Sequence, residues 1–293
     1  MKQFIILTAL IFICILTNKA SALPFCNFAD PSIEKCQINF KNGLGQVHFY
    51  KTNQSCDLVI LGIGTAMNID EYDTLSLEIS KNQNIAIIDH NPGWPFKTDA
   101  TKFASMVKKL ILDWKIHTKS LNENNCKIIV GGHSASGQAA HEALSNSAYQ
   151  ITDADGVFSL DPYDIRSQKK DITNIPGLYF GFNIATIPPK DAAKTAFDKT
   201  RHAIFYEIQT ANPDLTKGEF TPIYHHCSFA DDRKCGFPIF SSRIETPEIY
   251  TFVADKLNEF LENLKNKKAF EQIPSDVNNG LDGKLPPYKK FTK

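Results

Sequence analysis

Two serines follow a pair of glycines in the run Gly131-Gly132-His133-Ser134-Ala135-Ser136-Gly137. A serine hydroxyl becomes a good nucleophile when a histidine takes its proton and a carboxylate orients that histidine. Such a serine is often held on a sharp turn from a strand to a helix, where the residues two before and two after it must be small. Ser134 meets this condition with Gly132 and Ser136. Ser136 would have the larger Gln138 in the second place, so Ser134 is the better candidate.

The flanking sequence predicts the strand and the helix that such a turn requires. Residues 128–130 are short, apolar and β-branched, as in a buried strand. Residues 138–144 read Gln-Ala-Ala-His-Glu-Ala-Leu, which is good helix-forming sequence. The common G-x-S-x-G pattern ends here on Ser136 in place of glycine. The alternative interpretation is therefore a glycine-rich turn whose serines only cap the helix.

The run at 132–137, together with Ser159-Leu160-Asp161-Pro162 further along, resembles the α/β-hydrolase fold. Within that fold the likeness is to the lipase and chlorophyllase-like esterases. It covers residues 45–264 in organisation, whereas in sequence only these short motifs match. The resemblance implies the chain order serine, acid, histidine, with the acid at the carboxyl end of a strand.

Asp161 is the predicted acid. It follows the apolar run at 157–160, and Pro162 ends that strand because proline cannot continue the ladder of hydrogen bonds. In the esterases that the chain resembles, a Leu-Asp-Pro at the end of this strand carries the acid. Three later carboxylates remain alternatives: Asp164, Glu207 and Asp214.

Chain order removes most of the eight histidines as candidates for the general base. His202 begins a predicted strand, where a structural role is equally plausible. The remaining pair is His225 and His226, in a loop that a disulfide between Cys227 and Cys235 would stiffen. A rigid loop holds a base within hydrogen-bonding reach of its nucleophile. We expect His226 to be the base and keep His225 as the alternative.

The oxyanion of the reaction needs two backbone N–H donors. One is expected at Ala135, the residue after the nucleophile. The resemblance places the other at Ile63, in the glycine-containing loop of residues 61–65. Leu61 stands where the family usually has a histidine, and an ordinary turn is the alternative interpretation.

Short apolar runs alternate with segments of helical periodicity, which predicts one α/β domain with a doubly wound, mostly parallel sheet flanked by helices. The predicted strands are 47–50, 58–61, 85–88, 128–130, 157–160 and 203–208. Helices are expected at 99–117 and over 246–264, the second with Thr246 as N-cap and Pro247 at its first position. The domain is expected to span residues 23–264.

Two segments have no clear place in this pattern. Residues 165–200 contain the aromatic run Leu178-Tyr179-Phe180-Gly181-Phe182, which predicts either a lid over an acyl-binding pocket or a core element with its connections. Residues 265–293 are rich in lysine, asparagine and proline. Their composition predicts a loosely packed C-terminal tail.

The amino terminus predicts secretion. Residues 1–22 combine a basic start, an apolar stretch and small residues before a cleavage site near Ala22, which is typical of a signal peptide and too short for a membrane span. Of the seven cysteines, six remain after cleavage. Disulfides are expected between Cys26 and Cys36, Cys56 and Cys126, and Cys227 and Cys235. Asn53-Gln54-Ser55 is a glycosylation sequon.

These features together predict a secreted serine hydrolase that cleaves carboxylic esters. No metal or organic cofactor is expected. The formal net charge is zero, which argues against nucleic acid as a partner and gives no preference for charged substrates. The apolar segments favour a small-molecule or lipid ester as substrate. One alternative is a non-catalytic protein of the same fold that binds lipid or protein. Another is an acyltransferase or peptidase, because one triad serves water, alcohol and amine acceptors.

Overall fold

The computed structural model describes most of the chain. The described residues are 35–40, 45–90, 99–120, 125–163, 171–184, 191–211, 216, 224–231, 246–268, 270, 273–278 and 285–293. The expected signal peptide, residues 1–22, lies outside these ranges. No helix in the described part of the chain is long and apolar enough to cross a membrane.

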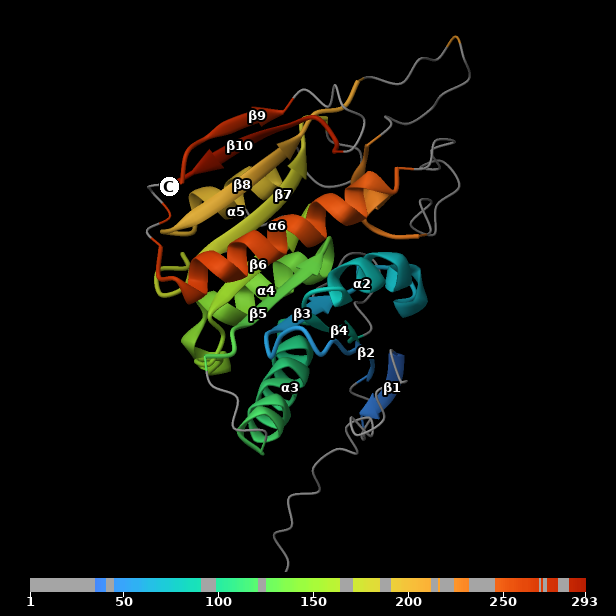
Figure 1. The fold of residues 1–293 in the computed structure, drawn as a ribbon, viewed down its shortest axis with the longest axis vertical. Helices are drawn as coiled ribbons and strands as arrows, with labels where there is room; N and C mark the ends of the chain where they lie inside the picture. Colours follow the sequence, from blue (N-terminus) through green and yellow to red (C-terminus); the bar gives the residue numbers. More distant parts are fainter. Residues whose placement is uncertain are drawn as a thin grey trace, which may run out of the picture.

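Ten strands of the described residues form one sheet in the order β1-β2-β4-β3-β5-β6-β7-β8-β10-β9 (Figure 1). The strands are β1 (Lys35–Phe40), β2 (Gly45–Tyr50), β3 (Leu58–Gly62), β4 (Asn84–Asp89), β5 (Ile128–His133), β6 (Gly156–Leu160), β7 (Gly177–Phe182), β8 (Ala203–Ile208), β9 (Asp276–Asn278) and β10 (Tyr288–Thr292). The six central strands, from β4 to β8, run parallel. The edge strands join them through antiparallel pairing.

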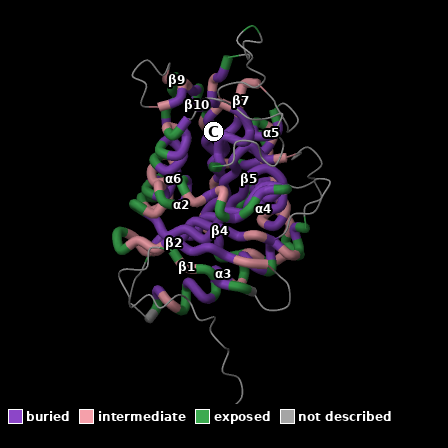
Figure 2. Tube along the Cα trace, turned by 90° about the vertical axis from the view of Figure 1, so that its right-hand side faces the viewer, coloured by how far each residue is buried: buried purple, intermediate pink, exposed green. Residues whose placement is uncertain are grey.

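Helices cover both faces of the sheet, as parallel strands require. They are α2 (Asp73–Ser80), α3 (Ala100–Ser120), α4 (Ala135–Ser145), α5 (Ala192–Asp198) and α6 (Glu248–Lys265). Figure 2 shows α2 and α6 on one side of the buried strands and α4 and α5 on the other. The apolar residues of α3 and α4 share one core cluster, whereas those of α2 and α6 belong to another. The protein is therefore a three-layer α/β structure.

All six predicted strands are confirmed, and the predicted helices correspond to α3, α4 and α6. The start of α6 differs slightly from the prediction. Pro247 itself occupies the N-cap position and the helix begins at Glu248. Thr246 acts just outside the helix, where its carbonyl accepts a hydrogen bond from the N–H of Ile249 at 3.1 Å.

The structure decides between the two interpretations of residues 165–200 and corrects the prediction for residues 265–293. Within the first segment, the aromatic run is β7, a central strand whose residues from Gly177 to Gly181 are buried, and residues 192–198 form α5. The lid interpretation therefore fails for these residues. The expected tail supplies β9 and β10, and β10 pairs with β8 along its whole length. Phe270, Ile273 and Tyr288 are buried in the core, so this segment is part of the fold.

The disulfide between Cys56 and Cys126 is confirmed and joins the residues just before β3 and β5. Cys36 and Cys227 are disulfide-bonded as well, and the cysteines expected to pair with them, Cys26 and Cys235, lie outside the described residues. Disulfides of this kind are typical of an oxidising compartment. Asn53 of the sequon is exposed.

Candidate active site

The carboxyl ends of the parallel strands meet at one edge of the sheet, and Ser134 and Asp161 lie side by side there. In the register of the sheet, the last residue of β5, His133, pairs with the last residue of β6, Leu160. Ser134 and Asp161 are the next residues on the two strands. The N–H of Ser134 donates to the carbonyl of Leu160 at 3.1 Å, which ties the two strand ends together.

Ser134 sits on a strained turn between β5 and α4. Its backbone has φ 54° and ψ −122°, which is rare for a residue with a side chain. The turn is too tight for any side chain at Gly132, because a Cβ there would lie 2.3 Å from the backbone carbonyl carbon of Ser136. This geometry is what a nucleophile elbow requires.

Ser136, which replaces the usual glycine of the pattern, has a specific place in the structure. It is buried, and its hydroxyl donates to the carbonyl of Ile63. The same oxygen lies 2.7 Å from Nε2 of His90, the residue after β4. Because the hydroxyl proton is directed at Ile63, the oxygen accepts from His90. The serine therefore connects the turn at Ser134 to the loops after β3 and β4.

Asp161 and His226 form a buried pair. Nδ1 of His226 donates to Oδ2 of Asp161 at 2.8 Å. Burial lowers the pKa of the His226 imidazole well below its ordinary value, so the ring is neutral and able to accept a proton at neutral pH. Burial raises the pKa of the Asp161 carboxyl, while the hydrogen bond from Nδ1 favours its carboxylate form.

His226 is held by a short and well-anchored turn, η6 (His226–Phe229). His225 caps this turn, because its Nδ1 accepts from the N–H of Cys227 and its own N–H donates to the hydroxyl of Ser228. Phe229 is fully buried and packs against the ring of Phe180 on β7. The cap and the buried anchor fix the position of the His226 ring.

The structure distinguishes among the predicted alternatives. His226 meets Asp161, whereas His225 serves as the cap of η6. Glu207 lies on β8 and accepts from the side chain of Gln209 at 2.8 Å. The two other alternative acids, Asp164 and Asp214, lie outside the described residues.

A hydrogen-bonded network that the sequence did not reveal lies beside this pair. The hydroxyl of Tyr72, in the turn η2 (Ile69–Tyr72), lies 2.6 Å from Nδ1 of His133 and accepts from the N–H of Gly64 at 2.8 Å. Nε2 of His133 lies 2.9 Å from the carbonyl of His226, and the two imidazole rings are 4.5 Å apart. Chain order excludes His133 as the general base because it precedes Ser134, but this criterion does not bear on a supporting role.

The loop after β3 differs from the expectation for an oxyanion hole. Ala135 opens α4, and the first N–H groups of a helix have no partner within it. The N–H of Ile63, however, donates to the carbonyl of Ile88 at 3.2 Å and extends the pairing of β3 with β4. This hydrogen bond argues against Ile63 as the second donor. Two residues on, the hydroxyl of Thr65 is buried and has no hydrogen-bond partner among the described residues.

A cavity of about 320 Å³ lies elsewhere, between the end of α4 and the residues before β7. Leu144, Ile151 and Ile175 are among its lining residues. These residues lie at the opposite edge of the sheet from Ser134, because they lie at the C-terminal end of α4 or precede parallel strands. The cavity is therefore separate from the serine and its partners.

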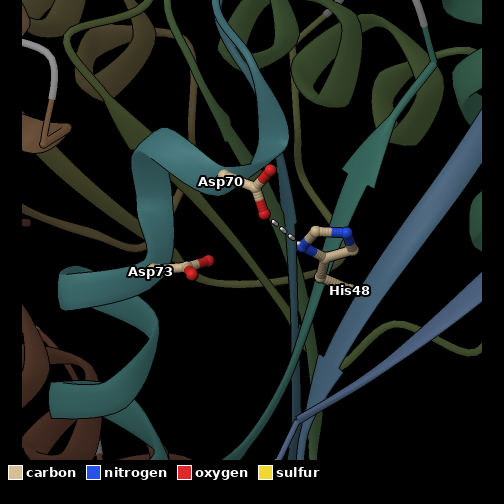
Figure 3. A group of neighbouring side chains, drawn as sticks. All are labelled: His48, Asp70 and Asp73. Carbon is tan, nitrogen blue, oxygen red and sulfur yellow. Dashed lines mark ion pairs between the residues drawn. The ribbon is translucent and has the colours of Figure 1, made fainter.

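A second cluster of polar side chains has the composition of a metal site. Figure 3 shows His48, Asp70 and Asp73 gathered together, with Nδ1 of His48 directed at Asp70, 3.4 Å from its Oδ1. The ammonium group of Lys35 already lies between the carboxylates, 3.1 Å from Asp70 and 2.8 Å from Asp73. Tyr50 donates a further hydrogen bond to Asp73. The Lys35 ammonium group thus offsets part of the negative charge of the cluster, which links β1 and β2 to η2 and α2.

No protein-family model matches the chain, and no curated protein is significantly similar to it in sequence.

Proposed function

We propose that this protein is a secreted serine hydrolase of the α/β-hydrolase fold that cleaves carboxylic esters. The observation that carries the proposal is the combination of Ser134 on a strained strand-to-helix turn with the buried hydrogen bond between His226 and Asp161. The three residues come from separate segments, after β5, after β6 and in η6. A turn that only capped a helix would need neither the strained serine nor the buried pair.

The arrangement of the strands supports the fold assignment. A mostly parallel sheet in the order β1-β2-β4-β3-β5-β6-β7-β8, with β2 antiparallel to its neighbours, is typical of α/β-hydrolases. The serine follows β5, and the chain order is serine, acid, histidine, as in that fold. The disulfide between Cys56 and Cys126 supports secretion.

In the proposed reaction, Oγ of Ser134 attacks the ester carbonyl carbon and Nε2 of His226 takes the hydroxyl proton. The carbonyl oxygen becomes an oxyanion. Its collapse expels the alcohol, which receives that proton from His226, and leaves an acyl group on Ser134. Water then attacks the acyl group with His226 again as the base, releasing the carboxylic acid and restoring the serine. Asp161 holds the Nδ1 proton of His226 and stabilises the transient imidazolium.

The oxyanion would rest on the N–H of Ala135 and on a second donor from the loop after β3. Ile63 and Gly64 have their N–H groups engaged, by Ile88 and Tyr72 respectively. We therefore assign the second donor to the hydroxyl of Thr65, which has no hydrogen-bond partner in the described part of the chain. A buried hydroxyl of this kind loses free energy unless it meets a polar group of the substrate.

An ester with an apolar acyl group suits the surroundings of His226. Phe229 in η6 packs against Phe182, a half-buried residue at the end of β7, with ring centroids 5.2 Å apart. The formal net charge of zero favours neither anionic nor cationic substrates. A lipid or another hydrophobic ester is the substrate class that follows.

The proposal is tested with p-nitrophenyl esters of rising acyl length and the purified, disulfide-intact protein. We expect release of p-nitrophenol by the wild type and loss of that activity in Ser134→Ala. Ser145→Ala, at the other end of the same helix, is the matched control and should keep full activity. Absence of turnover with every ester by a folded wild-type protein would contradict the proposal and favour a binding protein on a hydrolase scaffold.

A further inference from the structure

We infer that Tyr72 and His133 are positioning residues that lock the general base to the nucleophile turn and to the loop after β3. This inference rests on the proposed function, since it concerns how that site is held. Neither residue is placed to react. Both are fully buried, and their polar atoms are directed at groups of the site.

The hydrogen bonds allow one consistent placement of the protons. The N–H of Gly64 can only donate, so the oxygen of Tyr72 accepts from it. The Tyr72 hydroxyl then has its own proton to donate, and Nδ1 of His133 at 2.6 Å is a stronger acceptor than the sulfur of Met67 at 3.1 Å. With Nδ1 acting as acceptor, the proton of the neutral ring is on Nε2. That Nε2–H donates to the carbonyl of His226 at 2.9 Å.

Burial keeps the His133 imidazole and the Tyr72 hydroxyl in the neutral forms that this arrangement of protons requires. The pKa of the His133 imidazole is lowered well below its ordinary value, first by burial and then by the nearby ring of His226. Burial also raises the pKa of the Tyr72 hydroxyl, so the phenol keeps its proton. The hydrogen bonds from Gly64 through Tyr72 and His133 to His226, here called the relay, therefore join neutral donors and acceptors. Each group keeps its role as donor or acceptor across the neutral pH range.

The relay connects three segments that are distant in the sequence. It begins at Gly64 in the loop after β3, passes through Tyr72 and then His133 on β5, and ends at the backbone of His226. His133 is also the residue directly before Ser134. The His133 ring thus contacts the backbone carbonyl of the base, His226, while the His133 backbone is bonded directly to the nucleophile, Ser134. A shift of His226 or of Ser134 is therefore transmitted to the other.

Loss of the Tyr72 hydroxyl has a specific consequence. In Tyr72→Phe, the N–H of Gly64 and Nδ1 of His133 both lose their partner in a buried environment. His133 is then free to carry its proton on Nδ1, and this tautomer cannot donate to the carbonyl of His226. We expect the rate at which a fluorophosphonate labels Ser134 to fall about 10- to 100-fold, because a small displacement of a general base has effects of this size.

The matched control is Tyr179→Phe. Tyr179 is another fully buried tyrosine with a hydrogen-bonded hydroxyl, but its partner is Thr200 near α5, away from the site. We expect Tyr179→Phe to label at the wild-type rate. A second variant, His133→Gln, keeps an N–H donor for the carbonyl of His226 and should retain more labelling than His133→Phe, which keeps a ring but no donor.

The tautomer gives a readout that does not depend on activity. Nitrogen-15 NMR of the histidines should show His133 protonated on Nε2 in the wild type and changed in Tyr72→Phe. If the wild type shows this tautomer but no serine is labelled, the proposed function fails and the hydrogen-bonded relay stands. If Tyr72→Phe is labelled as fast as Tyr179→Phe, or if His133 in the wild type carries its proton on Nδ1, the relay is refuted whatever the activity.

Discussion

His141 links the stability of the fold to pH. It is fully buried on α4, and neither ring nitrogen has a hydrogen-bond partner among the described residues. Burial lowers the pKa of its imidazole to about 4; Lys199 acts in the same direction and Asp171 in the opposite one. In the unfolded chain the pKa returns to 6.5. Between these values the unfolded chain binds a proton that the folded protein does not, so the free energy of unfolding falls as the pH drops below 6.5.

The size of the effect follows from the two pKa values. From pH 8 to pH 5, this histidine should cost about 2 kcal/mol of unfolding free energy. His141→Leu removes the titrating group and its unpaired nitrogens. We expect it to stabilise the protein by on the order of 1 kcal/mol at pH 8 and by about 2 kcal/mol more at pH 5.

Urea unfolding at both pH values, followed by the fluorescence of the buried Trp114, measures these changes. His202→Leu is the control for the change from histidine to leucine itself, because His202 is only partly buried. If His141→Leu and the wild type lose the same unfolding free energy between pH 8 and pH 5, His141 does not link stability to pH.

Three further predictions concern the site and the disulfide. Thr65→Val should lower kcat for ester hydrolysis about 100-fold while Thr65→Ser keeps most of it, as expected for a hydroxyl oxyanion donor; equal activities would remove Thr65 from that role. Asp161→Asn should lower kcat by on the order of 10⁴-fold with little change in circular dichroism, because the amide cannot stabilise the imidazolium of His226; near-wild-type kcat would point to another acid. Removing the 70-residue link between Cys56 and Cys126 by double substitution with serine should cost about 4 kcal/mol in urea unfolding, and an unchanged midpoint would contradict this.

The sequence predicted the central strands well because both of their faces are buried. β3 and residues 128–130 of β5 are continuous apolar runs, and such runs are recognisable without knowledge of the neighbouring strand. β10 reads Tyr-Lys-Lys-Phe-Thr and has no continuous apolar run, because buried and exposed positions alternate along it. Its composition is therefore polar on average and resembles that of a tail. β7 contains two glycines among aromatic residues, a pattern that also suits a lid.

For the candidate site, the sequence identified residues that stand next to a recognisable strand, but it did not reveal contacts between residues far apart in the chain. Ser134 and Asp161 could be selected because each directly follows a recognisable strand. The distinction between His225 and His226 depends on which ring turns toward Asp161, and this is set by the cap of η6. The contact of Tyr72 with His133 joins residues 61 positions apart. Only the three-dimensional structure brings such a pair together.

The proposed function requires Ser134 to be an activated nucleophile. The most direct measurement is to incubate the disulfide-intact protein with a fluorophosphonate and map the modified residue by mass spectrometry. Ser134→Ala is the control. The proposed function predicts that Oγ of Ser134 displaces fluoride to give a single phosphonylated serine, and that this modification disappears in the variant. An unmodified wild-type protein, or the same extent of labelling in Ser134→Ala, would contradict the account.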